Sequence, residues 1–138
     1  LARDLAVEEA ILSVPFLDRS TLAAIYRHCA LLLLTSDREG FGLPVLEALA
    51  CGTPVVASDI AALREVGGDA VTYCDVDDVE EWRMRVAALL EERERRPEAW
   101  KSRRAAGVDR AAAFSWAKYA SDILPLYHRL AGVETASA

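Results

Sequence analysis

The sequence predicts an α/β fold, in which a parallel sheet of about four strands lies between two layers of helices. Short apolar segments rich in β-branched residues alternate with longer segments whose apolar residues recur at helical spacing. Glycine-containing turns separate them at positions 40–42, 52 and 67–68. After the last of these strands the pattern is helical only, which predicts extra helices at the C-terminal end. The 138 residues suit one domain.

The first strand and helix are predicted before position 30. Residues 10–14 form an apolar run that predicts a short strand, and residues 15–18 are its loop at the carboxyl end. Ligands gather at this edge of parallel sheets. Ser20 is predicted to cap a helix that continues to Cys29 and presents one apolar face.

The second strand and helix flank the most informative stretch of the chain. Residues 30–34 are entirely apolar, as expected for a strand buried on both faces. A helix is predicted over residues 43–50, because Pro44 suits a first helical turn and Gly52 suits the position just after a last turn. The loop between them therefore lies at the carboxyl edge of the sheet.

Two more strands are predicted over residues 53–57 and 70–73, where β-branched and apolar residues recur. Between them the sequence predicts a helix that continues through Glu65, with Ser58 or Asp59 as its N-cap. The acidic residues 75–78 are predicted to cap the helix that follows, because negative charge is favourable at a helix N-terminus.

The last part of the chain is predicted to be helical. One helix ends near Arg96, because Pro97 stops it, and a second covers residues 98–113 with its arginines exposed to solvent. Ser115 is predicted to cap the final helix, in which Pro125 introduces a kink or ends the first half. The apolar stripe of that helix is expected to stay exposed and to favour self-association. Residues 133–138 are predicted to form a disordered tail.

The stretch from Glu39 to Glu47 gives the clearest indication of function. Gly40 and Gly42 let the backbone turn sharply and approach a ligand without a Cβ atom in the way. The amides at the start of the helix have no partner inside it, and the helix dipole adds positive charge there, so we expect an anion. Glu47, one turn into the helix, points back toward the loop. The residues alone leave open that this is an ordinary βα turn.

Residues 35–58 resemble the signature of the group 1 glycosyltransferases, retaining enzymes of family 4 with the GT-B fold. The likeness is carried by a Glu, seven further residues and a second Glu, followed by an Ala-rich helix and a Gly-x-Pro-Val-Val strand. Residues 59–66 and 114–116 match as well. The resemblance implies that residues 1–132 are part of the C-terminal, nucleotide-sugar-binding domain, a three-layer Rossmann-like domain that lacks its first βα unit.

The resemblance also implies roles for individual residues. Glu39 would be the catalytic residue that binds hydroxyl groups of the donor sugar near C3 and C4. Glu47 would bind the ribose hydroxyls, because a carboxylate accepts two hydrogen bonds from a vicinal diol. The diphosphate and sugar would be held by the backbone amides of Gly40, Phe41, Gly42 and Leu43.

A further implied contact is to the nucleotide base. In the family, backbone groups of the loop after the first strand predicted here hold the base, which places this role on Phe16 and Leu17. An ordinary core position for Phe16 is the alternative. The resemblance implies a nucleotide diphosphate sugar as donor substrate, no cofactor, and no metal bridging the diphosphate.

The chain begins with Leu1 rather than Met, and we expect it to be a piece of a longer protein. The family implies a preceding acceptor-binding domain, which would be the partner of this one. It also implies a first βα unit with an Arg and a Lys that neutralise the leaving diphosphate. Without these parts the piece is expected to be inactive.

Composition narrows the classes of partner and compartment. A net charge of −6 argues against nucleic acid or an anionic membrane as the main partner. The three cysteines lack metal-like spacing and sit in apolar surroundings, so buried reduced thiols and a cytoplasmic location are expected. Peripheral contact with a membrane through the missing domain is a compatible alternative.

We therefore predict that the complete protein transfers a sugar from a nucleotide diphosphate sugar to an acceptor, with retention at the anomeric carbon. Two alternatives stay open. One is another GT-B enzyme, such as a nucleotide-sugar epimerase or a phosphorylase. The other is a non-catalytic nucleotide-binding or interaction domain.

Overall fold

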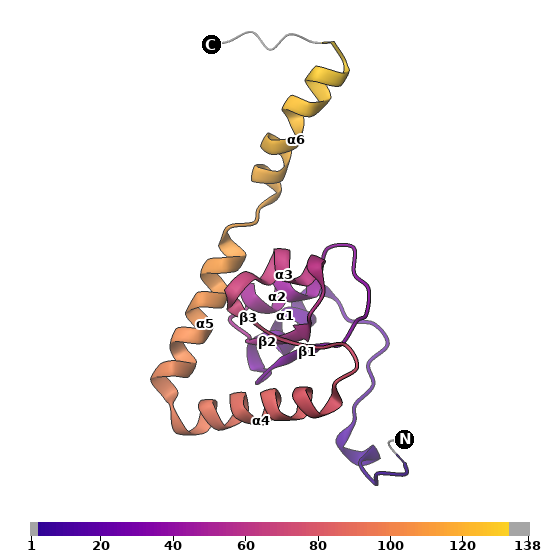
Figure 1. Ribbon diagram of the computed structural model, residues 1–138, viewed down its shortest axis with the longest axis vertical. Coiled ribbons are helices and arrows are strands. Elements are labelled where there is room, and N and C mark those ends of the chain that lie inside the picture. The colour runs from indigo at the N-terminus through magenta and orange to yellow at the C-terminus, as the bar shows by residue number, and fades with distance from the viewer. Residues whose placement is uncertain (1–2, 133–138) are drawn as a thin grey trace.

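A small parallel sheet forms the centre of the computed structural model, which describes residues 3–132 (Figure 1). Adjacent strands pair in parallel, with Leu33 opposite Val56 and Val56 opposite Thr72. The predicted α/β class with a parallel sheet is therefore confirmed. The described strands, in their spatial order, are β1 (Leu32–Leu34), β2 (Val55–Ser58) and β3 (Val71–Cys74).

Helices account for most of the remaining described residues. Their bounds agree with the predicted ones to within a few residues, as expected where periodicity is strong and ends are marked by Pro or Gly. They are α1 (Arg19–His28), α2 (Leu43–Ala50), α3 (Ala61–Gly67), α4 (Val79–Arg95), α5 (Pro97–Ala112) and α6 (Trp116–Leu130), with short 3₁₀ turns η1 (Glu8–Ala10) and η2 (Gly68–Ala70).

The first predicted strand is wrong. Residues 11–14 have no regular structure, and Leu12 is 87% exposed. An apolar run becomes a strand only where it finds an edge to pair with, and within residues 3–132 β1 pairs with β2 alone. The segment instead leads away from the sheet, as the indigo ribbon of Figure 1 shows. The described sheet consequently has three strands rather than about four.

Two helix caps differ from the prediction. Asp18, and not Ser20, caps α1, because its carboxylate accepts a hydrogen bond from the Thr21 amide at 3.0 Å. Neither Ser58 nor Asp59 caps α3, which follows Ile60 without a side-chain cap. The predicted caps of α4 and α6 are confirmed. Asp78 accepts from the Glu81 amide at 2.9 Å, and Ser115 accepts from the Lys118 amide at 3.1 Å.

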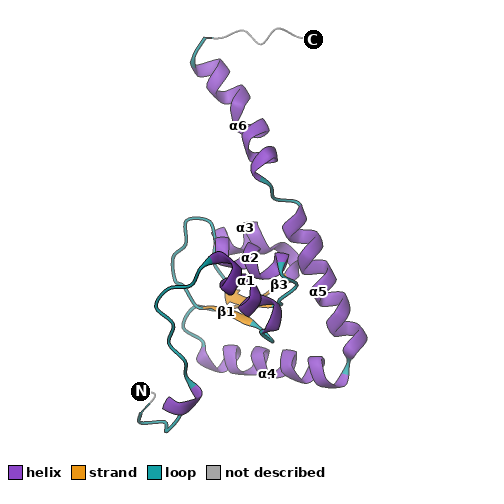
Figure 2. Ribbon diagram, turned by 180° about the vertical axis from the view of Figure 1, so that it is seen from behind, coloured by secondary structure: helices purple, strands orange, loops and turns teal. Residues whose placement is uncertain are grey.

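The core lies on both faces of the sheet. On one face, Val55 and Ala57 of β2 pack with Leu49 of α2 and Leu63 of α3. On the other face, Val56 packs in a smaller cluster with residues of α4 and α5. Figures 1 and 2 show α1, α2 and α3 on one side of the sheet and α4 on the other. The molecule is therefore a three-layer arrangement, as predicted.

β1 is not buried on both faces, in contrast to the prediction. Leu33 is 47% exposed, whereas its neighbour Val56 in β2 is fully buried. α4 packs against β2 and β3, and at the edge strand β1 it leaves Leu33 partly uncovered. Position in the sheet, rather than the apolar character of the run, decides how much of each strand is buried.

The three arginines of α5 were expected in solvent, and all three instead attach α5 to the rest of the domain. Arg103 pairs with Glu92 of α4 at 2.8 Å. Arg104 donates from Nε to the Gly52 carbonyl at 2.7 Å, and Arg110 donates to the Val66 carbonyl at 2.8 Å. The contacts of Arg104 and Arg110 satisfy carbonyls at the C-terminal ends of α2 and α3, which have no partner inside their helices.

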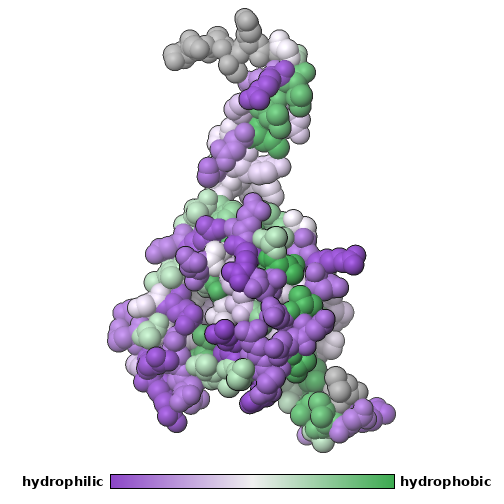
Figure 3. Space-filling model, viewed as in Figure 1, coloured by the Kyte–Doolittle hydropathy of each residue, from purple (hydrophilic) through white to green (hydrophobic). Residues whose placement is uncertain are grey.

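α6 projects from the body of the domain (Figures 1 and 2). None of its residues is buried, and it continues through Pro125 to Leu130, so the proline does not end it. Apolar side chains gather along one side of it in Figure 3, and Trp116 is 79% exposed. The exposed apolar area is confirmed, and self-association through it stays a prediction. Among the described residues, no helix combines the length and apolar character needed to cross a bilayer.

The predicted tail, residues 133–138, lies outside the described residues.

Candidate functional site

Residues 35–42, here called the glycine loop, connect the carboxyl end of β1 to α2. Gly42 is the residue just before α2 and adopts φ 93° and ψ 41°, which favours glycine. A Cβ atom there would lie 2.6 Å from Cδ2 of Leu63, so the packing of α3 also requires glycine. Gly40 differs, because a Cβ atom there would meet no described atom within 4 Å. Space is therefore open beside Gly40.

The start of α2 leaves its backbone donors free. Within residues 3–132, no side chain caps this helix, and the amides of residues 40–43 donate no hydrogen bond. The first amide of this segment that donates is that of Val45, to the Gly42 carbonyl at 3.0 Å. Phe41 and Leu43 are about half exposed, so the loop is open to solvent. Consecutive free amides at a helix start are suited to an anion.

Glu39 stands immediately before these amides. It is half-buried, and its carboxylate has no hydrogen-bonding or ionic partner among the residues that the structure describes. The group is therefore available to accept hydrogen bonds from hydroxyl groups of a ligand.

Glu47 lies on α2, one turn after the helix start, and is exposed. The Tyr26 hydroxyl of α1 donates to its Oε2 atom at 3.5 Å, near the limit for a hydrogen bond. Burial and the nearby Glu47 carboxylate raise the pKa of Tyr26, so the phenol stays protonated and can donate. Sequence reasoning missed this contact. The only available signal was a tyrosine on the apolar face of the helix that precedes β1.

The glycine loop also contacts the C-terminal part of the chain. The Phe41 and Phe114 rings form a T-shaped contact, with centroids 6.2 Å apart and planes at 79°. Phe114 also contacts Arg110, whose guanidinium lies 4.9 Å from the centroid of its ring. Arg110 in turn donates a hydrogen bond to the Val66 carbonyl. The glycine loop is thus connected to α5 through Phe114 and Arg110. No local sequence pattern indicates this pair, because it depends on the path of α5 across the domain.

The residues predicted to contact a nucleotide base lie before α1. Phe16 is 86% exposed, so the alternative that it belongs to the core is wrong. Leu17 is half-buried. Among the described residues, no hydrogen bond or ring contact joins either side chain to the glycine loop. Their role stays a prediction.

Ionisable groups near the carboxyl ends of β2 and β3 are engaged with one another. Asp59 forms an ion pair with Arg64, which holds the pKa of this carboxyl below its usual range. The Arg64 guanidinium lies 4.7 Å from the ring centroid of Tyr73, and the Tyr73 hydroxyl contacts the Leu63 carbonyl within α3 and the Gly68 carbonyl just after it. Throughout residues 3–132, no group of three or more His, Cys, Asp or Glu side chains is placed to hold a metal ion.

The comparisons with known proteins agree on this part of the chain. The family model described as "Glycosyl transferases group 1" matches residues 1–105, which include the glycine loop and α2. The chain belongs to this family. The expected resemblance is therefore confirmed.

Curated relatives carry a consistent name. The chain is 39% identical over 128 residues to a "D-inositol 3-phosphate glycosyltransferase" of Frankia alni, a match that covers 92% of this chain and 31% of the relative. It is 36% identical over 138 residues to the protein of that name from Mycobacterium marinum, covering 99% and 29%. The chain thus spans about 30% of the length of the curated relatives it matches.

A solved structure has the same arrangement of elements. The sucrose-phosphate synthase from Thermosynechococcus elongatus superposes with a TM-score of 0.83 at 25% identity, over 96% of this chain and 33% of that chain. The Rossmann-like α/β organisation expected for a domain of the GT-B fold is confirmed by this match.

Proposed function

We propose that this group 1 glycosyltransferase chain forms the donor site of an enzyme that transfers a sugar from a nucleotide diphosphate sugar to an acceptor, with retention at the anomeric carbon. The observation that carries the proposal is the run of free amides from Gly40 to Leu43 at the start of α2, with a carboxylate on each side of it. Family membership supports sugar transfer over the other GT-B activities and over a purely binding role.

The chemistry of the transfer matches these groups. The bond between the anomeric carbon and the diphosphate oxygen breaks, a bond to the acceptor oxygen forms, and the acceptor hydroxyl gives its proton to the departing diphosphate. Negative charge develops on the departing diphosphate. Fixed amide donors at a helix start stabilise such charge without reorganising during the reaction. No step requires a residue of this chain to act as nucleophile, and no cofactor or bridging metal is proposed.

The two carboxylates would hold the carbohydrate parts. Glu39 would accept hydrogen bonds from donor-sugar hydroxyls near C3 and C4, and Glu47 from the two ribose hydroxyls. Hydrogen bonds to a charged group contribute roughly 1.5–3 kcal/mol, which corresponds to about 10- to 150-fold in affinity. Tyr26, which donates to Glu47, would fix the orientation of that carboxylate.

The ribose role predicts a loss of nucleotide binding in Glu47→Ala. Calorimetry of the 138-residue chain with UDP and GDP should show at least tenfold weaker binding for this variant. Glu94→Ala on α4 is the matched control, because Glu94 is also exposed and lies outside the site. Equal affinities of Glu47→Ala and the wild type would reject the ribose contact.

The proposed sugar contact of Glu39 predicts different effects on nucleotide binding and on turnover. In the complete protein, Glu39→Ala should lose turnover while nucleoside diphosphate binding is kept, because its contact is to the sugar. D-inositol 3-phosphate is the first acceptor to assay, since the matched relatives bear that name. The anomeric configuration of the product, read by NMR, tests retention. Undiminished turnover of Glu39→Ala would count against the proposal, as would epimer formation without transfer.

A further inference from the structure

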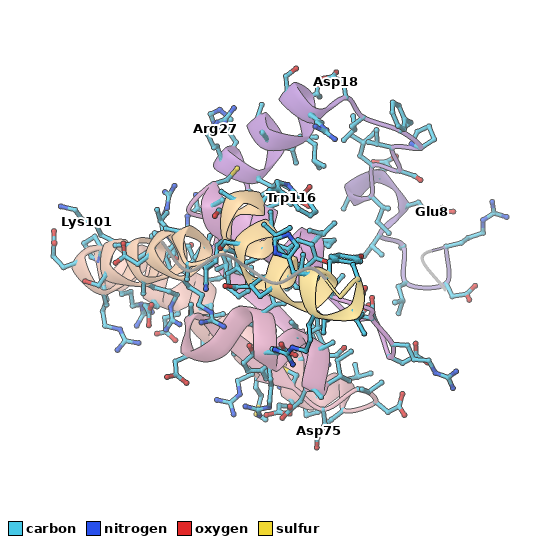
Figure 4. All side chains as sticks on the ribbon, turned by 90° about the horizontal axis from the view of Figure 1, so that it is seen from above. Glu8, Asp18, Arg27, Asp75, Lys101 and Trp116 are labelled. Carbon is cyan, nitrogen blue, oxygen red and sulfur yellow. The ribbon has the colours of Figure 1, made fainter. Side chains whose placement is uncertain are left out.

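A second candidate site lies at the opposite edge of the sheet. A cavity of about 140 Å³ opens where α1 and α4 end and α5 begins. Its walls include Ala30 and Pro54, which precede β1 and β2, so it faces the amino ends of the strands. The glycine loop follows the carboxyl end of β1. Figure 4 shows Asp18 and Arg27 at the two ends of α1, and the cavity lies at the Arg27 end.

The charged side chains of the cavity are all basic. Arg27, Arg93 and Arg104 line it together with His28, and no carboxylate is among the lining residues. This is unexpected in a chain whose net charge is −6. Basic residues often balance helix C-termini, and α1 and α4 both end here. Those two ends amount to about one negative charge in total, which is less than three guanidinium groups supply.

Neighbouring acids do not neutralise these arginines. On α4, Arg95 pairs with Glu91, and Glu92 is shared between Arg96 and Arg103. Arg93, on the same turns of the helix, has no ion pair among the described residues, and the same holds for Arg27. Glu91 and Glu92 are therefore occupied by other arginines, and no carboxylate lines the cavity to offset the charge of Arg27 and Arg93.

Part of the cavity is fixed in place. The Nε atom of Arg104 donates to the Gly52 carbonyl at 2.7 Å, which holds the guanidinium while its remaining N–H groups stay available. Trp100 is 9% exposed and forms a packed wall. A preorganised arginine loses less freedom on binding than a mobile one.

We propose that this cavity binds a phosphate-type dianion, either inorganic phosphate or a phosphate monoester, at a site separate from the glycine loop. Guanidinium groups match the tetrahedral oxygens of phosphate in charge and in hydrogen-bond geometry. The volume accommodates a phosphate group, whereas pockets for larger ligands measure about 300–1,000 Å³. A whole nucleotide sugar does not fit. The inference does not depend on the proposed transferase activity.

Phosphate binding tests the proposal directly. Inorganic phosphate should raise the melting temperature of the 138-residue chain at constant ionic strength, relative to chloride. The double variant Arg27→Gln/Arg93→Gln should bind phosphate at least tenfold more weakly in calorimetry. Arg85→Gln/Arg95→Gln is the matched control, because it also removes two positive charges, and neither arginine lines the cavity. Equal phosphate affinity in all three proteins would overturn the proposal.

A second readout uses Cys29, which lines the cavity and is exposed, although the sequence predicted it to be buried. Phosphate should slow the reaction of this thiol with 5,5′-dithiobis(2-nitrobenzoate) at least threefold. In Cys29→Ser, the part of the reaction that phosphate slows should be absent. Cys51 and Cys74 serve as internal references. Unchanged labelling rates would contradict binding at this place.

Two further experiments identify the type of phosphate that binds and the place where it binds. Phenyl phosphate and dimethyl phosphate distinguish a monoester dianion from a diester monoanion, and we expect only the former to match inorganic phosphate. UDP binding should be unaffected in Arg27→Gln/Arg93→Gln. If UDP binding falls together with phosphate binding, the two ligands share one site, and the proposal of a separate phosphate site is rejected.

Discussion

The starts of α1 and α2 solve the same physical problem in opposite ways. Asp18 supplies a carboxylate that accepts hydrogen bonds from the backbone and side chain of Thr21, so the beginning of α1 is satisfied by the protein itself. α2 begins at Gly42, which has no side chain to offer, and the preceding amides point to no described acceptor. The first end is structural, and the second is open to a ligand.

The absence of a side-chain cap is not by itself distinctive, because α3 and α5 also lack one among the described residues. What sets α2 apart is the combination of Gly42 in a left-handed conformation against Leu63 and open space at Gly40. One glycine is required by the fold, and the other is required only if something approaches from outside. The packing thus explains why Gly42 is a glycine, and the ligand contact at Gly40 stays a proposal.

The largest expected effect on stability is that of Gly42→Ala. The added methyl group would combine a left-handed backbone conformation with a 2.6 Å approach to Leu63. We expect a loss of about 2–4 kcal/mol in the free energy of unfolding, since strain and overpacking both contribute. Urea denaturation followed by circular dichroism measures it. An unchanged midpoint would show that the loop relaxes and that Gly42 is not fixed by packing.

Gly40→Ala should give the reverse result. No described atom lies within 4 Å of the new methyl group, so the free energy of unfolding should change by less than about 1 kcal/mol. If a diphosphate approaches the backbone here, UDP affinity should fall at least tenfold in calorimetry. Retained affinity, with Gly42→Ala unfolded or weakened as expected, would mean that the ligand keeps its distance from Gly40.

At α1, the expected effect depends on pH. Hydrogen bonds from Ser20 and Thr21 hold the pKa of Asp18 well below its usual range. Because the pKa is lower in the folded chain than in the unfolded one, the stabilisation is present above about pH 4 and is lost as the pH falls further. Asp18→Ala should lower the melting temperature at pH 7, and the difference from wild type should shrink toward pH 2.

Asp18→Asn is the control for this prediction. An amide oxygen also accepts a hydrogen bond at an N-cap, and it does not titrate. Its melting temperature should therefore vary less with pH than that of the wild type in the acidic range. Identical acid profiles for all three proteins would place the stabilisation elsewhere.

The smallest effect is expected for Tyr26→Phe. The hydrogen bond to Glu47 measures 3.5 Å, so its loss should cost about 0.5 kcal/mol or less. UDP affinity should fall about twofold if the hydroxyl orients the ribose-binding carboxylate. In the Glu47→Ala background the same change should have no effect on affinity. A further loss there would show that Tyr26 does not act through Glu47.

Local signals in the sequence were sufficient for much of the fold and for the outline of the site. Pro44 and Gly52 fixed the bounds of α2 to the residue, because each acts on the backbone of its own turn. The same logic placed one cap among residues 75–78, where Asp78 fills it, and another at Ser115. It failed at residues 10–14, since an apolar run does not specify a pairing partner. It failed at α1, where Asp18 and Ser20 both suit a cap and only the backbone path selects one.

The sequence by itself therefore determined the order of elements from α1 onward, the family, and the position of Gly40 and Gly42 between two carboxylates. The tertiary structure alone decided that Gly42 is held by Leu63 while Gly40 faces open space, that Tyr26 reaches Glu47, and that Phe114 braces Phe41. It also gathered the arginines of α1, α4 and α5 around one cavity. The physical reason is the separation along the chain over which each interaction acts. Caps and turns act over a few bonds of the chain, whereas these contacts join distant segments and exist only after the helices have packed on the sheet.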